Sequence, residues 1–154
     1  LAAAALVALA REKLPLPAGA ACLSPWVDLT NCAASYRTRA HTDKLFGHAQ
    51  AEAAAELYLA GRPADEDDFD DPLASPLFAD WAGMPPLLIH AGDAEVLLDD
   101  ATGLAGRARS AGVDVHLSVY PEMPHVWHLA YPAFPEAVRA VEEIAAFVRR
   151  CVSA

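Results

Sequence analysis

The feature that most constrains the fold is a strand–helix–strand pattern in the second half of the chain. Residues Pro86–Ala91 are apolar apart from His90, which is typical of a strand covered on both faces. Leu97–Ala111 repeats apolar residues at helical spacing and stops before a glycine. Val113–Tyr120 alternates apolar and polar residues, which predicts one buried face and a place near a sheet edge. Together they predict two parallel strands joined by a crossover helix.

The rest of the chain continues this alternation of helix and strand. The other predicted elements are a strand at Gly19–Ser24 and helices at Leu1–Lys13, His48–Ala60 and Pro135–Arg150, with a polar loop at Asn31–Gly47. Such an order predicts an α/β fold with parallel strands and crossover helices. The 154 residues are enough for one ordinary domain.

Charge and composition exclude several classes of partner. The formal net charge of −10 disfavours nucleic acids and anionic membranes, which need basic patches. No apolar run approaches the roughly 20 residues of a membrane-spanning helix. The acidic run Asp65–Asp71 lacks the ligand-and-glycine spacing of an EF-hand loop, so a solvated loop is expected. Three cysteines without metal-ligand spacing predict free thiols, a cytoplasmic location and no metal site.

Two acids follow the strand Pro86–Ala91 closely enough to reach over its end. Asp93 and Glu95 lie in the loop before the next helix. Catalytic groups in an open parallel sheet sit just outside the carboxyl ends of the strands. Asp99 and Asp100 fall in the first helical turn, where the helix dipole favours acids for structural reasons. Position alone leaves three interpretations open: a catalytic Glu95, a catalytic Asp93, or a purely structural role.

Histidines follow the next predicted strand. His125 comes shortly after Val113–Tyr120 and follows Pro121 and Pro124, which restrict the backbone. Histidine is the natural general base near neutral pH. A surface-loop histidine is the alternative interpretation, and His128 is the second candidate base. His90, within a strand, is expected to be a packed or hydrogen-bonded core residue.

An acid and a histidine at neighbouring strand ends make two thirds of an acid–base–nucleophile triad. No serine lies in the Gly-x-Ser-x-Gly turn that exposes a nucleophile. Ser110 comes closest, but it ends a helix and does not follow a strand. Cys22 and Cys32 lack that setting as well. The sequence therefore offers no nucleophile to complete the triad.

Four stretches in order resemble the C-terminal half of the hormone-sensitive-lipase-like (bacterial family IV) carboxylesterases of the α/β-hydrolase superfamily. They are Leu14–Thr30, Asp71–Leu77, Pro85–Asp100 and Tyr120–His125. The resemblance implies that the catalytic acid is Glu95 and the catalytic base is His125. The family's more familiar Asp-Pro-Leu-x-Asp aligns with Glu-Val-Leu-Leu-Asp here, and some members use Glu. The separation of 30 residues (125 − 95) matches the family.

The same resemblance carries expectations about the whole chain. Leu1–Lys13 is similar to the helix behind the nucleophile elbow, so residues 1–154 are expected to be the C-terminal portion of one α/β-hydrolase domain. The elbow and the N-terminal half are expected to lie upstream. The implied activity is carboxylic ester hydrolysis by a serine esterase acting on a small-molecule ester, without metal or organic cofactor. This chain alone is expected to be inactive.

Alternatives remain at this stage. Because family members often pair through the strand equivalent to Val113–Tyr120, that strand is a candidate homodimer edge. The alternative function is a truncated or degenerate homologue that acts as a non-catalytic interaction module. A protease or another acyl-transfer hydrolase on the same fold is a third interpretation, since fold does not fix function.

Overall fold

The computed structural model of the protein describes residues 1–60 and 68–153. Three strands, β1 (Ala20–Leu23), β2 (Leu87–Gly92) and β3 (Val115–Tyr120), form the sheet of this described part. Its helices are α1 (Ala2–Arg11), α2 (Ser35–Thr38), α3 (His48–Leu59), α4 (Leu98–Ser110) and α5 (Pro135–Val152). Short 3₁₀ turns lie at Asp68–Asp70, Pro76–Phe78 and Trp127–Ala130.

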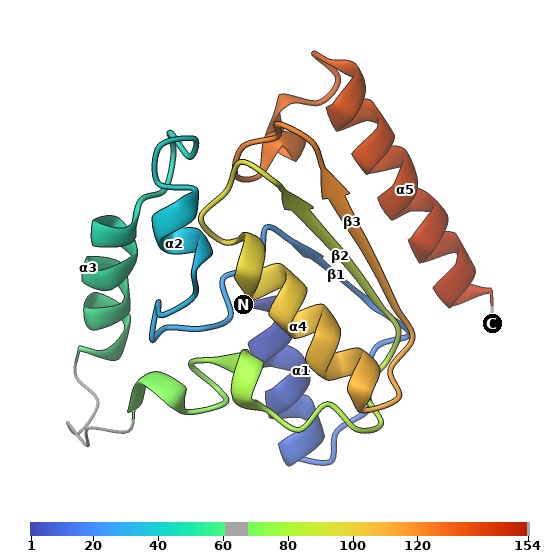
Figure 1. Cartoon of the computed structure of the whole chain (residues 1–154). Helices are drawn as coiled ribbons and strands as arrows, with labels where there is room; N and C mark the ends of the chain where they lie inside the picture. Colours follow the sequence, from blue (N-terminus) through green and yellow to red (C-terminus); the bar gives the residue numbers. More distant parts are fainter. Residues whose placement is uncertain (61–67, 154) are drawn as a thin grey trace.

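The strands are parallel and are ordered β1-β2-β3, so the predicted parallel sheet with crossover helices is confirmed (Figure 1). Ala20 pairs with Leu87, and Leu87 pairs in turn with Val115. Every residue of β2 is buried, as its apolar sequence predicts for a central strand. β1 and β3 form the two edges of the described sheet. The carboxyl ends of all three strands point to one edge, where the candidate site lies.

Helices cover both faces of the sheet. Side chains of α1 and α4 share one apolar core with Leu87, Ile89 and Ala91 of β2. Successive residues of a strand point to opposite faces, so Leu88 and His90 face the other side. There α5 covers the sheet, and Figure 1 shows it opposite α4.

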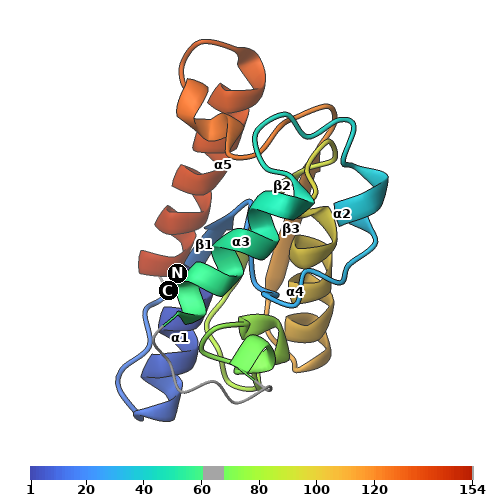
Figure 2. The same cartoon turned by 90° about the vertical axis from the view of Figure 1, so that its left-hand side faces the viewer.

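Helix α3 lies outside these layers. It packs through buried Ala51 and Ala55, against Tyr36 and Leu29 of the segment that follows β1. Figure 2 shows α3 in front of the sheet, away from α5. The segment between β1 and α3 is therefore anchored, although only α2 within it is regular.

Several sequence predictions need correction. The expected loop Asn31–Gly47 contains the four-residue helix α2, which short polar sequence could not reveal. The strand predicted to begin at Val113 begins at Val115, and its polar face is not simply solvated. Ser118 and Tyr120 on that face are partly buried, because they bond to a carboxylate of α5. Val119, predicted to be buried, is 41% exposed instead.

The structure also bears on the predictions about cysteines, the acidic run, metal ligands and membrane-spanning helices. The three cysteines are free thiols. Residues 65–67 of the acidic run lie outside the described residues, and 68–70 form a 3₁₀ turn. No cluster of metal-ligand side chains occurs in residues 1–60 and 68–153. None of the helices in that part is long and apolar enough to cross a bilayer.

Candidate active site

The turn that follows β2 brings an acid over the end of the sheet. Glu95 lies between Gly92, the last residue of β2, and the start of α4. The turn packs against the loop after β3 so closely that a Cβ on Gly92 would lie 1.9 Å from the carbonyl oxygen of Met123. A glycine is needed there because any side chain would push the two loops apart.

Glu95 and His125 form a direct pair. The Oε2 atom of Glu95 accepts a hydrogen bond from His125 Nδ1 at 2.9 Å. The other oxygen, Oε1, accepts hydrogen bonds from Gly92 N and, at 2.8 Å, from Ser24 Oγ. Glu95 has no exposed surface, whereas the His125 side chain is 27% exposed. A buried carboxylate with each oxygen bonded is held in one orientation, and it fixes the imidazole in turn.

The imidazole of His125 is also supported on its face. The ring of Phe46 stacks on it, with 5.8 Å between centroids and 22° between planes. Asp43 holds this segment in place, because its Oδ1 accepts the Phe46 N–H and its Oδ2 accepts the N–H of Val96. No pattern in the sequence pointed to Phe46 or Asp43, since aromatic contacts between distant loops leave no periodic signal.

The other acids near the end of β2 accept hydrogen bonds from the backbone of other segments. Asp93 Oδ1 accepts the backbone N–H of Glu122, which ties the turn after β2 to the turn after β3. Asp99 accepts the N–H of Ser35 at 2.8 Å. Asp100, at 1% exposure, accepts the N–H groups of Val27 and Asp28, and burial raises its pKa to about 7. The structure therefore brings Glu95 to His125 and leaves Asp93 in a backbone-bracing position.

A second histidine cluster lies beneath α5. His90 is fully buried, and its Nδ1 lies 3.1 Å from Nε2 of His128. Its Nε2 lies 3.1 Å from Glu143 Oε2, without the alignment of a hydrogen bond. Glu143 accepts hydrogen bonds from three side chains of β3, namely His116, Ser118 and Tyr120. His90 is thus the core residue that its strand position predicts.

Burial has the largest effect on the pKa values of this cluster. Desolvation lowers the pKa of His128 to about 4, and the neighbouring His90 adds to the shift. Desolvation likewise lowers the pKa of His90, against the opposing charge of Glu143. Burial alone would raise the pKa of Glu143, but the hydrogen bonds from Ser118 and Tyr120 hold it below its usual value. Both histidines are therefore neutral near pH 7.

Among the described residues, no serine hydroxyl is hydrogen-bonded to the His125 ring. The buried serines are committed elsewhere: Ser24 to Glu95, Ser35 to the Val96 carbonyl and Ser75 to the Phe69 carbonyl. Ser118 donates to Glu143. The structure thus contains an oriented acid–base pair, and the geometry assigns no nucleophile to it.

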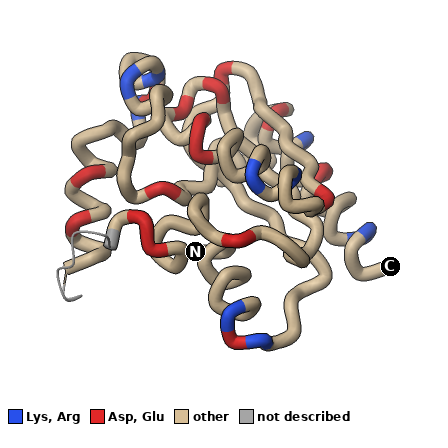
Figure 3. Tube along the Cα trace, turned by 60° about the horizontal axis from the view of Figure 1, so that its bottom comes forward, with Lys and Arg blue, Asp and Glu red and all other residues tan. Residues whose placement is uncertain are grey.

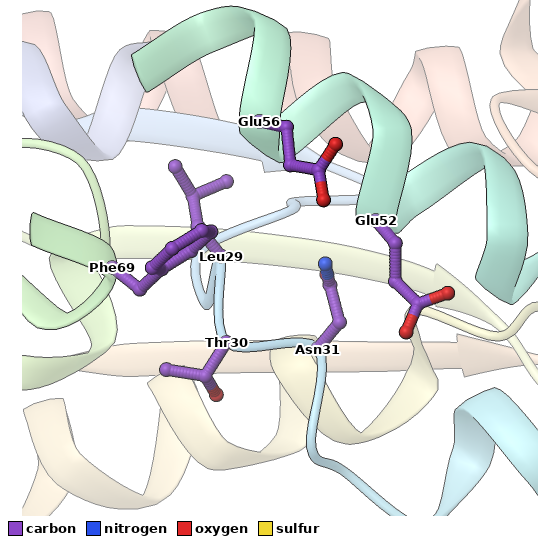
Figure 4. A pocket seen from close by; sticks show the side chains of 6 residues that line it. All are labelled: Leu29, Thr30, Asn31, Glu52, Glu56 and Phe69. Carbon is purple, nitrogen blue, oxygen red and sulfur yellow. The ribbon is translucent and has the colours of Figure 1, made fainter. Parts of the chain in front are cut away.

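A pocket of about 520 Å³ lies between α3 and the segment after β1 (Figure 4). Its described lining consists of Leu29, Thr30, Asn31, Glu52, Glu56 and Phe69. Figure 4 shows the carboxylates of Glu52 and Glu56 reaching into this space from α3. Neither Glu95 nor His125 belongs to that lining, so the size of this pocket does not identify the chemical site.

Comparison with known proteins supplies the family. A family described by the α/β-hydrolase fold matches residues 1–129. An acetyl-hydrolase of Streptomyces hygroscopicus is 48% identical over 149 residues, which are 97% of this chain and 48% of the relative. An esterase of Acinetobacter venetianus is 36% identical over 132 residues, 86% of this chain and 42% of the relative. A crystal structure of an esterase from the bacterial hormone-sensitive lipase family is similar with a TM-score of 0.91 and 44% identity, covering 97% of this chain and 49% of that one.

The chain therefore belongs to the α/β-hydrolase family. Within it, the similar solved structures are bacterial esterases of the hormone-sensitive lipase family, which confirms the resemblance seen in the sequence motifs. The chain spans about half the length of the curated relatives that it matches.

Proposed function

We propose that this chain supplies the acid and the base of a serine carboxylesterase, with Glu95 as the acid and His125 as the base. The observation that carries the proposal is the 2.9 Å hydrogen bond from His125 Nδ1 to a fully buried carboxylate. It lies at the carboxyl ends of β2 and β3, where α/β folds hold their reacting groups. The esterases and the acetyl-hydrolase among the relatives favour an ester as the substrate.

The chemistry follows from the orientation of the imidazole. With Nδ1 donating to Glu95, the neutral ring carries its lone pair on Nε2. Nε2 accepts the proton of a serine hydroxyl as that oxygen bonds to the ester carbonyl carbon, and later gives it to the departing alcohol. Water then attacks the acyl carbon while Nε2 takes its proton, and that proton passes to the serine oxygen as the acyl–serine bond breaks and the carboxylic acid leaves. Throughout, the carboxylate of Glu95 stabilises the imidazolium that forms, and the proton transfers need no metal.

The nucleophile belongs, in this proposal, to a part of the protein outside these 154 residues. We propose that residues 1–154 are the C-terminal portion of one α/β-hydrolase domain. That fits the half-length coverage of the relatives. The competing proposal is a degenerate homologue that acts as a non-catalytic interaction module. The coding sequence upstream of Leu1 discriminates between the two proposals. A Gly-x-Ser-x-Gly there supports the esterase, and its absence supports the module.

The enzymatic test compares the isolated 154-residue chain with the full-length protein on a p-nitrophenyl ester. We expect turnover only from the full-length protein, with loss of that turnover after treatment with a serine-directed organophosphate. Circular dichroism of the isolated chain checks that its inactivity is not caused by unfolding. Organophosphate-sensitive turnover by the isolated, purified chain would show that the nucleophile lies within these residues.

The distribution of basic residues and the edge strand β3 bear on the partners of the protein. In the described part of the chain, Lys and Arg lie on several separate elements (Figure 3). The absence of a nucleic-acid partner remains a prediction from the net charge of −10. We propose a homodimer through β3, because it is an edge strand with a 41% exposed Val119. Sedimentation of the full-length protein at several concentrations tests it, and a monomer throughout contradicts it. The cytoplasmic location remains a prediction from the free thiols.

A further inference from the structure

Ser24 touches both halves of the acid–base pair, although it lies far from each in the sequence. It follows β1 directly, 71 residues before Glu95 and 102 before Val126, the residue after His125. Its hydroxyl donates to Glu95 Oε1 at 2.8 Å and accepts the N–H of Val126 at 3.0 Å. The residue is 4% exposed, so water does not compete for either bond. A single hydroxyl therefore joins the acid to the loop that carries the base.

The backbone on both sides of this link is in the left-handed region. Ser24 has φ of 45°, and Val126 has φ of 46° and ψ of 41°. That region is costly for a residue other than glycine, and above all for a β-branched valine. Such conformations persist where the surroundings over-determine them. Here the Ser24 N–H also donates to the His90 carbonyl at 2.8 Å, which extends the β1–β2 ladder up to the site.

The geometry excludes Ser24 as the attacking serine. A nucleophilic hydroxyl gives its proton to the imidazole nitrogen remote from the acid. The Ser24 hydroxyl donates instead to Glu95, the group on the Nδ1 side of His125. No hydrogen bond joins Ser24 Oγ to the His125 ring in the described structure. The residue therefore acts on the base through Glu95 and through the backbone of Val126.

We propose that Ser24 is a positioning residue that fixes the Glu95 carboxylate and the His125 loop relative to each other. The role rests on the proposed function for its catalytic consequence, but the positioning itself is a property of these residues. Without the hydroxyl, Glu95 Oε1 keeps only the Gly92 N–H, and the Val126 N–H becomes a partly buried donor without its partner. Both changes loosen the orientation of His125.

The test uses the full-length protein with two substitutions that separate the hydroxyl from the backbone. Ser24→Ala removes the hydroxyl and leaves the strained conformation. Ser24→Gly removes the hydroxyl and relieves the strain, so it keeps the fold if the alanine variant does not. Ser75→Ala is the matched control. Ser75 is fully buried, and its hydroxyl also bridges two backbone groups, the Leu29 N–H and the Phe69 carbonyl, away from Glu95.

Two readouts are taken for each variant. The first is steady-state hydrolysis of a p-nitrophenyl ester, in which we expect kcat to fall about 10- to 100-fold in both Ser24 variants with KM nearly unchanged, because misorientation acts on the chemical step. The second is the low-field proton NMR signal of His125 Nδ1–H. We expect that signal in the parent and in Ser75→Ala, and its broadening or loss in both Ser24 variants.

The outcomes separate the two proposals. If the parent is active and the glycine variant keeps parental kcat and the low-field signal, Ser24 does not position the pair, while the esterase proposal stands. If the parent is inactive, the proposed function fails, and the low-field signal still decides whether Ser24 orders His125. A Ser75→Ala variant that loses kcat as the Ser24 variants do would show that any buried serine bridge matters, which also overturns the specific role.

Discussion

The Glu95–His125 pair and the His90–Glu143 pair both bring a glutamate to a histidine, and they differ in which partner is buried. In the Glu95–His125 pair the acid has no exposed surface and the base is 27% exposed. In the cluster beneath α5 the order is reversed: His90 is fully buried, and the Glu143 side chain is 28% exposed. The contacts are equally close, at 2.9 and 3.1 Å. Proximity of an acid and a histidine therefore does not separate a chemical site from a structural one.

Access to the histidine does separate the two pairs. A general base must reach the substrate while its acid stays oriented, and the arrangement of Glu95 and His125 suits that task. His90 stacks on His128 and on Trp127 of the 3₁₀ turn Trp127–Ala130, so no substrate atom can approach His90 without displacing that turn. Desolvation also lowers the pKa of both histidines, which makes them poor proton acceptors.

The largest effect is expected from the base. In the full-length protein, His125→Ala should lower kcat by on the order of 10⁶-fold, because no group remains to take the proton of the nucleophile. His128→Ala should keep kcat within about tenfold and lower the melting temperature, since it leaves His90 without its partner. Kinetics and thermal unfolding of both variants check this. An inactive His128→Ala beside a nearly parental His125→Ala would move the catalytic base to the cluster beneath α5.

Replacement of the acid should lower kcat less than replacement of the base. Glu95→Gln keeps a carbonyl oxygen for His125 but loses the charge that stabilises the imidazolium, so kcat should fall by on the order of 10⁴-fold and stay measurable. Asp93→Asn, the matched control, keeps an acceptor for the Glu122 N–H and should retain parental kcat. Initial rates on a p-nitrophenyl ester with both variants make the comparison. Greater loss from Asp93→Asn than from Glu95→Gln would reverse the assignment of the acid.

In the second cluster we expect a change in stability without a change in chemistry. Glu143→Gln should lower the free energy of unfolding by about 1–3 kcal/mol, because three hydrogen bonds from β3 lose their charged acceptor. Its kcat should stay within about twofold of the parent. The neighbouring Glu142 is exposed, so Glu142→Gln provides the control and should change neither quantity. Denaturant unfolding and initial rates test both, and a large fall in kcat for Glu143→Gln alone contradicts the division of roles.

Much of this comparison was open to prediction from the sequence. Periodicity predicted the three parallel strands and the long helices, because repeated apolar spacing reflects burial on one face or two. The position of His90 inside an apolar strand predicted a core residue. Strand ends also narrowed the acid to Asp93 or Glu95, and only the motif resemblance favoured Glu95. The catalytic roles of Glu95 and His125 remain predictions, whereas the hydrogen bond between these two side chains is present in the structure.

What escaped prediction depends on contacts between distant segments. Nothing in the local sequence marks Ser24 as a partner of the acid, because its bond to Glu95 spans 71 residues. Phe46 and Asp43 support the site from an irregular segment, which has no repeat to detect. The polar face of β3 was expected to be solvated, because nothing in α5 marks Glu143 as the acceptor of three bonds. Local pattern predicts elements, whereas the polar contacts between elements depend on the folded arrangement.

The smallest expected effect is a dependence of stability on pH that arises from the second cluster. The pKa of His128 is lowered to about 4 from 6.5, so between those values the unfolded chain binds more protons than the folded protein. His128 therefore contributes stability that is present above pH 6.5 and is lost as the pH falls toward 4. The pKa of His90 is also lowered, which acts in the same direction.

The test replaces His128 by a side chain that does not titrate. His128→Gln should lose less stability than the parent between pH 7 and pH 4.5, by on the order of 2 kcal/mol in the free energy of unfolding. Asp100 acts in the opposite direction, since its pKa of about 7 means that stability is lost as the pH rises from its unfolded value toward 7. Both proteins are therefore also compared in an Asp100→Asn background, where the pH dependence of the parent should become steeper. Parallel curves of unfolding free energy against pH for the parent and His128→Gln in both backgrounds would show that protonation of His128 is not coupled to unfolding. The burial of that imidazole would then no longer distinguish the second cluster from the first.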